Sequence, residues 1–323
     1  MTTSSGRLAT PFELAGLRVY VAGHRGMVGQ ALVRRLGRED CTILTADHSA
    51  LDLRRQRETE EWMSAQQPDV VVLAAATVGG ILANDTRPAD FLYNNLAIET
   101  SVIEAARRVG AGKLLLLGSS CIYPRLAVQP ITETALLSGS LEPTNQWYAV
   151  AKIAGIMLCR AYRQQYGMDC ISAMPTNLYG PGDNFHERDS HVVPALIRKI
   201  HNACTCDADR VEIWGTGRPR REFLHVDDCA DALVHLLQHY SGESHVNVGT
   251  GSDVSIAELA NLIASIAGYR GQFTYDTSKP DGTPQKLLDI SMLQTLGWQS
   301  RIGLQDGLQS TYEWYATTAA KES

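Results

Sequence analysis

The chain has 323 residues, of which 44% are hydrophobic and 20% are charged, and its formal net charge at pH 7 is -6. This composition predicts a folded protein with a large core and excludes a disordered chain. The net negative charge argues against a nucleic-acid partner. No apolar run approaches the roughly 20 residues of a membrane span, so no membrane partner is expected either.

Residues 1–16 contain Thr, Ser and Gly but no apolar stretch, so we expect a flexible leader rather than a signal peptide. The seven cysteines form no C-x-x-C framework, and Cys204 and Cys206 lack the spacing of metal ligands. We therefore expect reduced thiols, no metal site and a cytoplasmic location.

Short apolar segments alternate with helical patterns from residue 17 to about residue 180. Strands are predicted at 17–23, 41–46, 68–76, 114–117 and 169–175, and helices at 26–37, 89–110 and 146–167. Apolar strands that alternate with helices indicate an α/β fold, a doubly wound parallel sheet of the Rossmann type. We assign 17–180 to a dinucleotide-binding domain.

The pattern changes after residue 180. Helices are predicted within 191–200, 227–240 and 255–268, between short strands. We expect residues 181–323 to form mainly a smaller α/β substrate lobe, with some segments that return to pack on the first domain.

Gly23, Gly26 and Gly29 form a G-x-x-G-x-x-G loop between the first predicted strand and its helix. Such a loop lets the backbone approach a pyrophosphate, whose charge the helix N-terminus stabilises. Its position directly after the first strand favours a dinucleotide site over a simple tight turn.

The choice between NADP and NAD stays open in this region. Arg25 could reach a 2′-phosphate and His48 could serve it, whereas Asp47 is suited to a free ribose 2′-hydroxyl. Asp52 is a candidate for contact with adenine, or else a cap for the next helix.

Tyr148 and Lys152 lie one helical turn apart, in the first predicted helix after Ser119. A free tyrosine titrates near pKa ~10, and a neighbouring ammonium and a bound nicotinamide cation favour its phenolate. We therefore expect a lowered tyrosine pKa and proton exchange with a carbonyl or alcohol oxygen that Ser119 also binds. A solvated surface pair is the structural alternative.

Several motifs, spread over roughly residues 18–315, resemble the extended short-chain dehydrogenase/reductases and, within them, the family of GDP-L-fucose synthases. They are VAGHRGMVG, VGGILAN, GSSCIYP, LEPTNQWYAVAKIAGI, MPTNLYGPGDNFH, WGTGRPRREFLHVDD, HVNVGTG and SKPDGTPQKLLD. The resemblance implies 3,5-epimerisation and NADPH-dependent 4-reduction of GDP-4-keto-6-deoxy-D-mannose to GDP-L-fucose. It also implies a homodimer formed through the helices 89–110 and 146–167.

The resemblance gives Cys121 and His191 a role. A 4-keto group acidifies the hydrogens on both neighbouring carbons, so inversion needs a base on one face and an acid on the other. The family pattern implies Cys121 as the base and His191 as the acid, and Ser119, Tyr148 and Lys152 complete the catalytic set. Without that pattern, a cysteine such as Cys121 is more often a small core residue, and a histidine such as His191 is more often a helix-entry residue.

The resemblance also implies which residues hold the two nucleotides. The cofactor, NADP(H) or alternatively NAD(H), would be held by Gly23, His24, Arg25, Gly26, Met27, Val28, Gly29, His48, Asp52, Leu117, Gly118, Ser119, Ser120, Lys152, Pro175, Thr176, Asn177, Leu178 and His191. The GDP-linked sugar would be held by Lys199, Trp214, Arg221 and Asp281.

Three positions depart from the family pattern. Thr77 stands where lysine is usual, and Arg87 stands where tyrosine is usual. The second predicted strand ends near His48 without the usual arginine, which leaves the preference for NADP open. A GDP-linked deoxyheptose or dideoxy sugar is therefore an alternative substrate. A UDP-sugar 4-epimerase or dehydratase is a further alternative, as is a sensor that binds a dinucleotide without turnover, against which the Tyr148/Lys152 pair argues.

Overall fold

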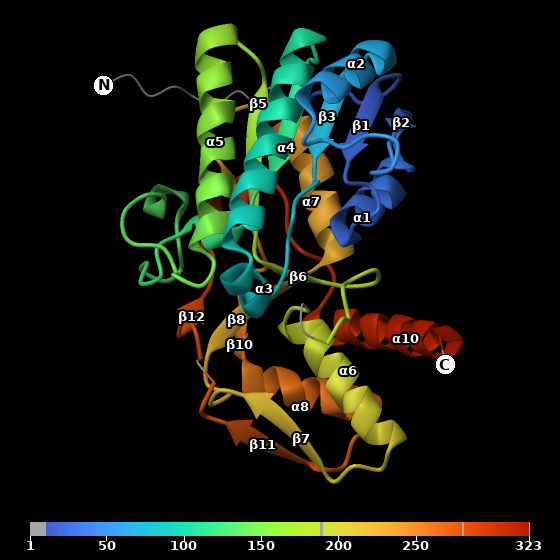
Figure 1. Cartoon of the computed structure of the whole chain (residues 1–323), viewed down its shortest axis with the longest axis vertical. Coiled ribbons are helices and arrows are strands. Elements are labelled where there is room, and N and C mark those ends of the chain that lie inside the picture. Colours follow the sequence, from blue (N-terminus) through green and yellow to red (C-terminus); the bar gives the residue numbers. More distant parts are fainter. Residues whose placement is uncertain (1–10, 188–189, 280, 323) are drawn as a thin grey trace.

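A six-stranded parallel sheet forms the centre of the computed structural model, which describes residues 11–187, 190–279 and 281–322 (Figure 1). The strand order is β2-β1-β3-β4-β5-β9. The strands are β1 Arg18–Ala22, β2 Thr42–Leu44, β3 Val70–Leu73, β4 Lys113–Leu117, β5 Cys170–Pro175 and β9 Val246–Val248. The predicted doubly wound fold and its five strands are confirmed, with β2 and β3 shorter than predicted. The sixth strand, β9, comes from the carboxy-terminal part of the chain.

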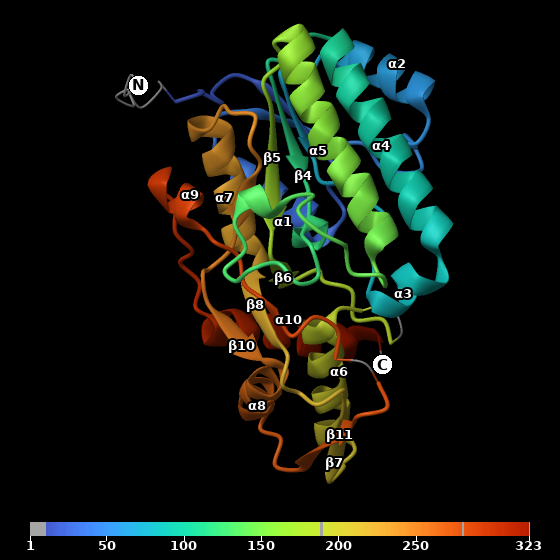
Figure 2. The same cartoon turned by 90° about the vertical axis from the view of Figure 1, so that its left-hand side faces the viewer.

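Two layers of helices cover this sheet (Figures 1 and 2). One face carries α2 (Gln56–Gln66), α4 (Pro88–Arg108) and α5 (Gln146–Tyr166), and the other carries α1 (Met27–Leu36) and α7 (Val226–His239). Leu114 and Leu116 of β4 join the core under α4 and α5, whereas Leu115 joins the core under α1 and α7. Both faces are buried, which explains the unbroken apolar run of this strand. None of the helices in the described part of the chain is both long and apolar enough to cross a membrane.

A smaller lobe packs at one end of the main sheet (Figure 1). Its strand β8 (Arg220–His225) pairs with β6 (Asn177–Tyr179), β10 (Asp253–Ser255) and β12 (Gln285–Lys286), and β7 (Arg210–Trp214) pairs with β11 (Gln272–Asp276). Helices α6 (Val192–Thr205), α8 (Ile256–Ala267) and α10 (Leu304–Glu322) surround its own apolar core. The three helices predicted after residue 180 are present, and the middle one, α7, packs against α1 on the main sheet.

The strand order places the topological switch point of the sheet between β1 and β3. The chain leaves β1 toward β2, returns across β1 to β3 and then continues toward β4. The connections therefore diverge between β1 and β3. In open α/β sheets this is the point at which ligands bind.

Candidate active site

The glycine loop after β1 fits a dinucleotide. Gly23 has a φ of +88°, and a Cβ there would lie 2.7 Å from the Cα of Ala75, in the segment after β3. A Cβ at Gly29 would overlap the carbonyl oxygen of Gly23, so both positions require glycine. Helix α1 begins at Met27 without a side-chain cap, which leaves its first amides available to an anion. The backbone thus forms a cradle suited to a pyrophosphate.

An ion-pair cluster lies beside the glycine loop. The Arg25 guanidinium binds both carboxylate oxygens of Asp47, with Nε–Oδ1 and Nη2–Oδ2 distances of 2.7 and 2.8 Å. His24 Nε2 lies 3.1 Å from the same carboxylate. Arg25, which is suited to a 2′-phosphate, and Asp47, which is suited to a 2′-hydroxyl, therefore form an ion pair with each other.

Asp52 is engaged by the protein. Its carboxylate accepts hydrogen bonds from Arg54 Nε and Nη2 at 2.9 and 2.8 Å, and these bonds lower the pKa of Asp52 to about 2. The side chain of His48, which lies between Asp47 and Asp52 in the sequence, is exposed. Contacts of Asp52 or His48 with the adenosine part of a cofactor stay predictions.

Ser119, Tyr148 and Lys152 lie together where β4 meets α5. The side chains of Tyr148 and Ser119 are hydrogen-bonded, and the Lys152 ammonium lies 5.8 Å from the centroid of the Tyr148 ring. Lys152 Nζ donates to the carbonyl oxygen of Leu117 at 3.0 Å. The structure therefore brings the three predicted residues into one cluster, and the lysine is buried rather than solvated.

Glu99 of α4 supplies a buried counter-charge to this cluster. Its Oε1 lies 3.0 Å from Lys152 Nζ, and each of the two side chains is 2% exposed. A Cβ at Gly155 would lie 2.5 Å from Glu99 Oε2, so the glycine on α5 provides the space that the carboxylate occupies. Burial raises the pKa of Glu99, while the attraction to Lys152 opposes that shift.

The prediction that the neighbouring ammonium lowers the tyrosine pKa is wrong, and the effect predicted for a bound nicotinamide cation stays a prediction. Burial raises the pKa of Tyr148 well above its ordinary value, and the nearby Cys121 and Glu99 raise it further. The Lys152 ammonium does not reverse this shift because the Glu99 carboxylate compensates its charge. The phenol therefore stays protonated at neutral pH, which is the form that can give a proton to an alkoxide.

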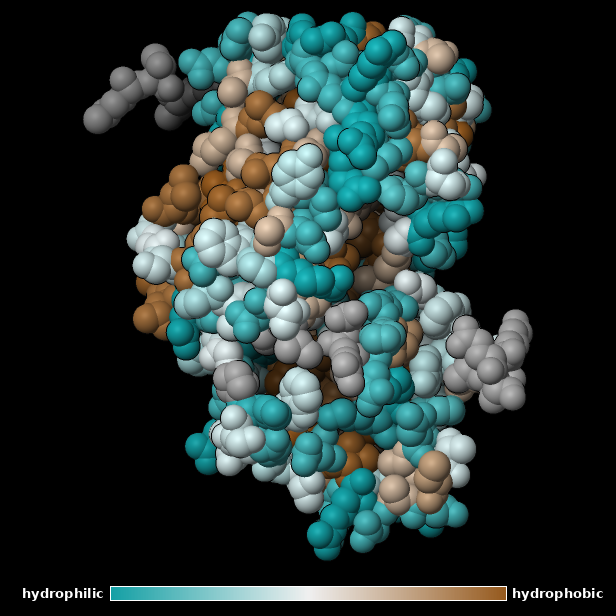
Figure 3. Space-filling view, in the orientation of Figure 1, coloured by the Kyte–Doolittle hydropathy of each residue, from teal (hydrophilic) through white to brown (hydrophobic). Residues whose placement is uncertain are grey.

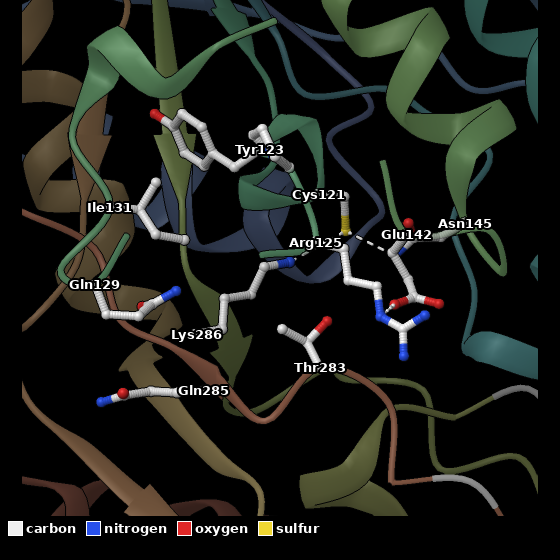
Figure 4. Close-up of a pocket in the computed structure, with 11 residues that line it drawn as sticks. Cys121, Tyr123, Arg125, Gln129, Ile131, Glu142, Asn145, Thr283, Gln285 and Lys286 are labelled. Atoms are coloured by element: carbon white, nitrogen blue, oxygen red, sulfur yellow. Dashed lines mark hydrogen bonds and ion pairs between the residues drawn. The ribbon is translucent and has the colours of Figure 1, made fainter. Parts of the chain in front are cut away.

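Cys121 lies in a short 3₁₀ helix, Ser120–Ile122, directly after β4. Its sulfur accepts a hydrogen bond from Asn145 Nδ2 at 3.4 Å and one from Lys286 Nζ at 3.8 Å (Figure 4). The pocket around it is further lined by Arg125, Gln129, Glu142 and Thr283. The sulfur thus faces polar groups, which favours a chemical role over that of a core residue.

His191 precedes the first residue of α6 and makes no capping hydrogen bond with its side chain. The residue is exposed, yet the protein around its ring partly desolvates the imidazole and lowers its pKa. No contact among the described residues joins His191 to Cys121 or Tyr148. The pairing of this imidazole with the thiol across a sugar stays a prediction.

The four residues predicted to bind the nucleotide sugar all lie in the lobe. Lys199 Nζ is 5.4 Å from the centroid of the Trp214 ring. Asp281 accepts hydrogen bonds from the backbone N–H and the hydroxyl of Thr216, at 2.7 and 2.8 Å, and attracts the half-buried Arg221. The carboxylate of Asp281 therefore joins its own loop to the turn that follows β7.

The segment Pro175–Leu178 leaves the main sheet and enters the lobe as β6. Thr176 Oγ1 and Asn177 Nδ2 both donate to the carbonyl oxygen of Glu222, at 3.2 and 2.8 Å. These side chains join the domain to the lobe, and their contact with a nicotinamide stays a prediction. Gly118 is needed for packing, because a Cβ there would overlap the thioether of Met174.

Three further residues of the cluster are absent from the predicted set. Asn145 and Lys286 both fall within quoted motifs, but a bond between residues 165 positions apart has no local signal. Glu99 is an acidic residue on a helix whose neighbours Ile98, Val102 and Ile103 are buried. A carboxylate on the apolar face of a helix is the one sequence signal that could have identified it.

A comparison with known proteins places this site in a family. A model of the NAD dependent epimerase/dehydratase family matches residues 19–249, and the chain belongs to that family. A GDP-L-fucose synthase of Sinorhizobium fredii is 56% identical over 309 residues, which are 96% of this chain and 98% of that protein. Within the larger family, the chain belongs with the GDP-L-fucose synthases.

Two solved structures resemble the whole chain. A GDP-L-fucose synthetase from Naegleria fowleri bound to NADP has a TM-score of 0.88 at 25% identity, over 97% of this chain and 98% of that one. A GDP-6-OMe-4-keto-L-xylo-heptose reductase from C. jejuni has a TM-score of 0.88 at 35% identity, over 95% and 99%. With the glycine cradle, these relatives support a nicotinamide dinucleotide as the cofactor.

Proposed function

We propose that the chain converts GDP-4-keto-6-deoxy-D-mannose into GDP-L-fucose by 3,5-epimerisation and NADPH-dependent 4-reduction. The observation that carries the proposal is the position of Cys121. The Cys121 N–H donates to Ser119 Oγ at 3.3 Å, so its thiol lies beside the Ser119–Tyr148 pair. A reductase that only transfers hydride has no use for a second proton-transfer group at this place.

In the epimerisation, Cys121 and His191 would act on opposite faces of the sugar. The Cys121 thiolate takes the proton from C3 or C5, so that an S–H bond forms and the electron pair moves to the oxygen on C4. The His191 side chain, in its protonated imidazolium form, then delivers a proton to the other face of that carbon, so that the ketone is restored and neutral imidazole remains. Exchange of both groups with solvent prepares them for the second carbon.

In the reduction, Ser119 and Tyr148 would hold the oxygen on C4. Bound NADPH would supply the hydride for C4. The protonated Tyr148 phenol gives its proton to the oxygen as negative charge develops there, and Ser119 stabilises that charge by a hydrogen bond. The buried Lys152 fixes the geometry through Leu117 and Glu99.

The lobe would bind the GDP part of the substrate. The Trp214 ring offers a flat face at the end of β7, where Lys199 adds positive charge. Arg221 is suited to grip the diphosphate with two parallel hydrogen bonds. These roles agree with the position of the lobe at the end of the sheet that carries the catalytic cluster.

Product analysis tests this function. Supplied with GDP-4-keto-6-deoxy-D-mannose and NADPH, the chain is expected to consume NADPH and to form GDP-L-fucose, identified by NMR. A product that keeps the configuration at C3 and C5 would contradict the epimerase, and binding of NADPH without its consumption would support a sensor.

A related GDP-4-keto sugar is a second candidate substrate. Arg87 lies over the ring of Phe91, with 5.8 Å to the centroid, and the Phe91 ring packs edge-on against Tyr148 at 6.4 Å. The position that departs from the family pattern is therefore close to the catalytic cluster. Faster turnover of a GDP-4-keto-heptose than of the 6-deoxyhexose would favour this candidate.

For the cofactor we propose NADP(H), with Arg25 as the ligand of the 2′-phosphate. Arg25→Gln is expected to weaken NADPH binding by about 10- to 100-fold, because a charge-assisted hydrogen bond contributes ~1.5–3 kcal/mol. NADH binding is expected to change little. The KM values for both cofactors measure this difference.

Asp47→Asn is the matched variant. It removes the carboxylate that holds Arg25 and that would repel a phosphate, so NADPH is expected to bind more tightly. An Arg25→Gln variant with equal losses for NADPH and NADH would show that Arg25 does not contact the 2′-phosphate.

We also propose a homodimer through α4 and α5. These helices lie side by side on the outside of the molecule (Figure 2), and Tyr93, Trp147 and Val150 on them are exposed. Figure 3 shows hydrophobic residues among hydrophilic ones on the same side. Light scattering is expected to give twice the chain mass, and Val150→Glu is expected to give a monomer. A monomeric native chain would refute the proposal.

A further inference from the structure

We infer that Lys286 is a positioning residue that holds Cys121 in the thiolate form and is contributed by the substrate lobe. The inference rests on the proposed function, since it concerns the group assigned there as the base. Lys286 Nζ lies 3.8 Å from Cys121 Sγ, within hydrogen-bond range for sulfur, and points at it across the pocket (Figure 4). Asn145 Nδ2 is a second donor, at 3.4 Å.

The backbone around Lys286 is held on both sides. The N–H of Leu287 donates to Gln129 Oε1 at 2.8 Å, and the N–H of Leu288 donates to the buried Glu222 Oε2 at 3.0 Å. In β12, Lys286 pairs with Arg221 of β8. The ammonium therefore reaches the thiol from a fixed strand rather than from a free surface loop.

In the part of the chain that the structure describes, the other charged groups that line the pocket do not pair with the Lys286 ammonium. Arg125 and Glu142 line the same pocket but pair with each other at 3.1 Å. Tyr148 stays protonated, as shown above. Among the described residues, Lys286 has no carboxylate partner in an ion pair. Its positive charge is thus directed at the sulfur of Cys121.

A thiolate, and not a thiol, removes a proton from carbon. A cation close to a cysteine favours the thiolate, and a hydrogen bond to the sulfur adds to this effect. Asn145 orients the sulfur but carries no charge, so the electrostatic part of the stabilisation belongs to Lys286. Because Lys286 lies on the lobe, the base is complete only when lobe and sheet domain are packed together.

The reactivity of the thiol tests the inference in the full-length chain. Alkylation by iodoacetamide is followed between about pH 5 and about pH 9 by mass spectrometry of the Cys121 peptide. In Lys286→Met, which keeps the length of the side chain, we expect the alkylation midpoint to rise by about one pH unit or more. The rate at neutral pH then falls by about tenfold, since each unit is a factor of ten in thiolate. Lys286→Arg is expected to keep the native profile.

Cys206 is the internal control, because it is exposed and lies outside the pocket. Its alkylation is expected to be equal in all three proteins, and a general change in folding would alter it. An unchanged Cys121 profile in Lys286→Met overturns the inference. In that case a raised KM for the GDP-sugar would show that Lys286 binds the diphosphate instead.

Deuterium uptake separates this inference from the proposed function. In Lys286→Met, uptake at C3 and C5 is expected to fall at neutral pH and to recover at higher pH, because the thiol then ionises without help. If Cys121→Ser keeps full uptake, the assignment of the base fails, whatever the alkylation shows. If Cys121→Ser loses deuterium uptake but Lys286→Met matches the native chain in both alkylation and uptake, Cys121 remains the base and the inference about Lys286 fails.

Discussion

Tyr148→Phe is expected to lower the rate of C4 reduction by roughly 10²–10⁴-fold, the usual contribution of a positioned general acid. The substitution removes only the hydroxyl that is hydrogen-bonded to Ser119. The ring and its edge-on packing against Phe91 remain, so the fold should be unaffected. Oxidation of NADPH, followed by absorbance with GDP-4-keto-6-deoxy-D-mannose present, measures the loss.

Epimerisation in this variant is expected to lose less than reduction. Ser119 still binds the oxygen on C4, and the Cys121 thiol is unchanged, so deuterium from solvent should still enter at C3 and C5. Tyr166→Phe is the matched control, because Tyr166 lies on the same helix but is exposed and packs on Tyr162. A reduction rate in Tyr148→Phe equal to that of the control would exclude Tyr148 as the acid.

The raised pKa of Tyr148 has a consequence for pH dependence. A phenol with a pKa above its ordinary value of ~10 stays protonated over the whole neutral range. The reduction needs the protonated form of Tyr148. As the pH rises from neutrality to about 9, deprotonation of this phenol is therefore not expected to lower the activity. An alkaline fall of activity near neutrality would instead have to come from another group.

Cys121→Ser is the second substitution with a large expected effect. A serine hydroxyl is a far weaker acid than a thiol and is not converted to its anion by a nearby ammonium at neutral pH. Deuterium uptake at C3 and C5 is therefore expected to fall by roughly 10²–10⁴-fold. Mass spectrometry of the recovered GDP-sugar measures the uptake.

Reduction should survive in this variant, and it would then give a sugar reduced at C4 without inversion at C3 and C5. Cofactor affinity should stay almost unchanged, because no part of the glycine cradle is altered. Cys206→Ser, an exposed cysteine of the lobe, is the control. Native levels of deuterium uptake in Cys121→Ser would remove the thiol from the mechanism.

Much of the architecture was predictable because its signals are local. The apolar run Leu114–Leu117 has the length of a strand and no polar face, which requires helices on both sides of the sheet. Gly23 and Gly29 have their spacing because the turn before α1 has no room for a Cβ. The motif GSSCIYP placed Cys121 beside Ser119, since neighbours in sequence remain neighbours in a short 3₁₀ helix.

The electrostatic state of the site was not predictable in the same way. The pKa of Tyr148 depends on its burial and on Glu99, which belongs to another helix. The environment of the Cys121 sulfur depends on Lys286, which arrives from β12 in the lobe. Arg25 and Asp47 each had a predicted ligand, but their pairing appears only once β1 and β2 are adjacent.

Sequence alone therefore specified the parallel sheet, the glycine cradle and the types of residue that carry the chemistry. All of these follow from patterns among residues that are close together in the sequence. The folded structure was needed to show that Glu99 compensates the charge of Lys152 and that the Tyr148 phenol keeps its proton. It was also needed to show that the Lys286 ammonium faces the Cys121 thiol. Charge interactions depend on distance and on exclusion of water, and both are set by packing between segments that are remote in the chain.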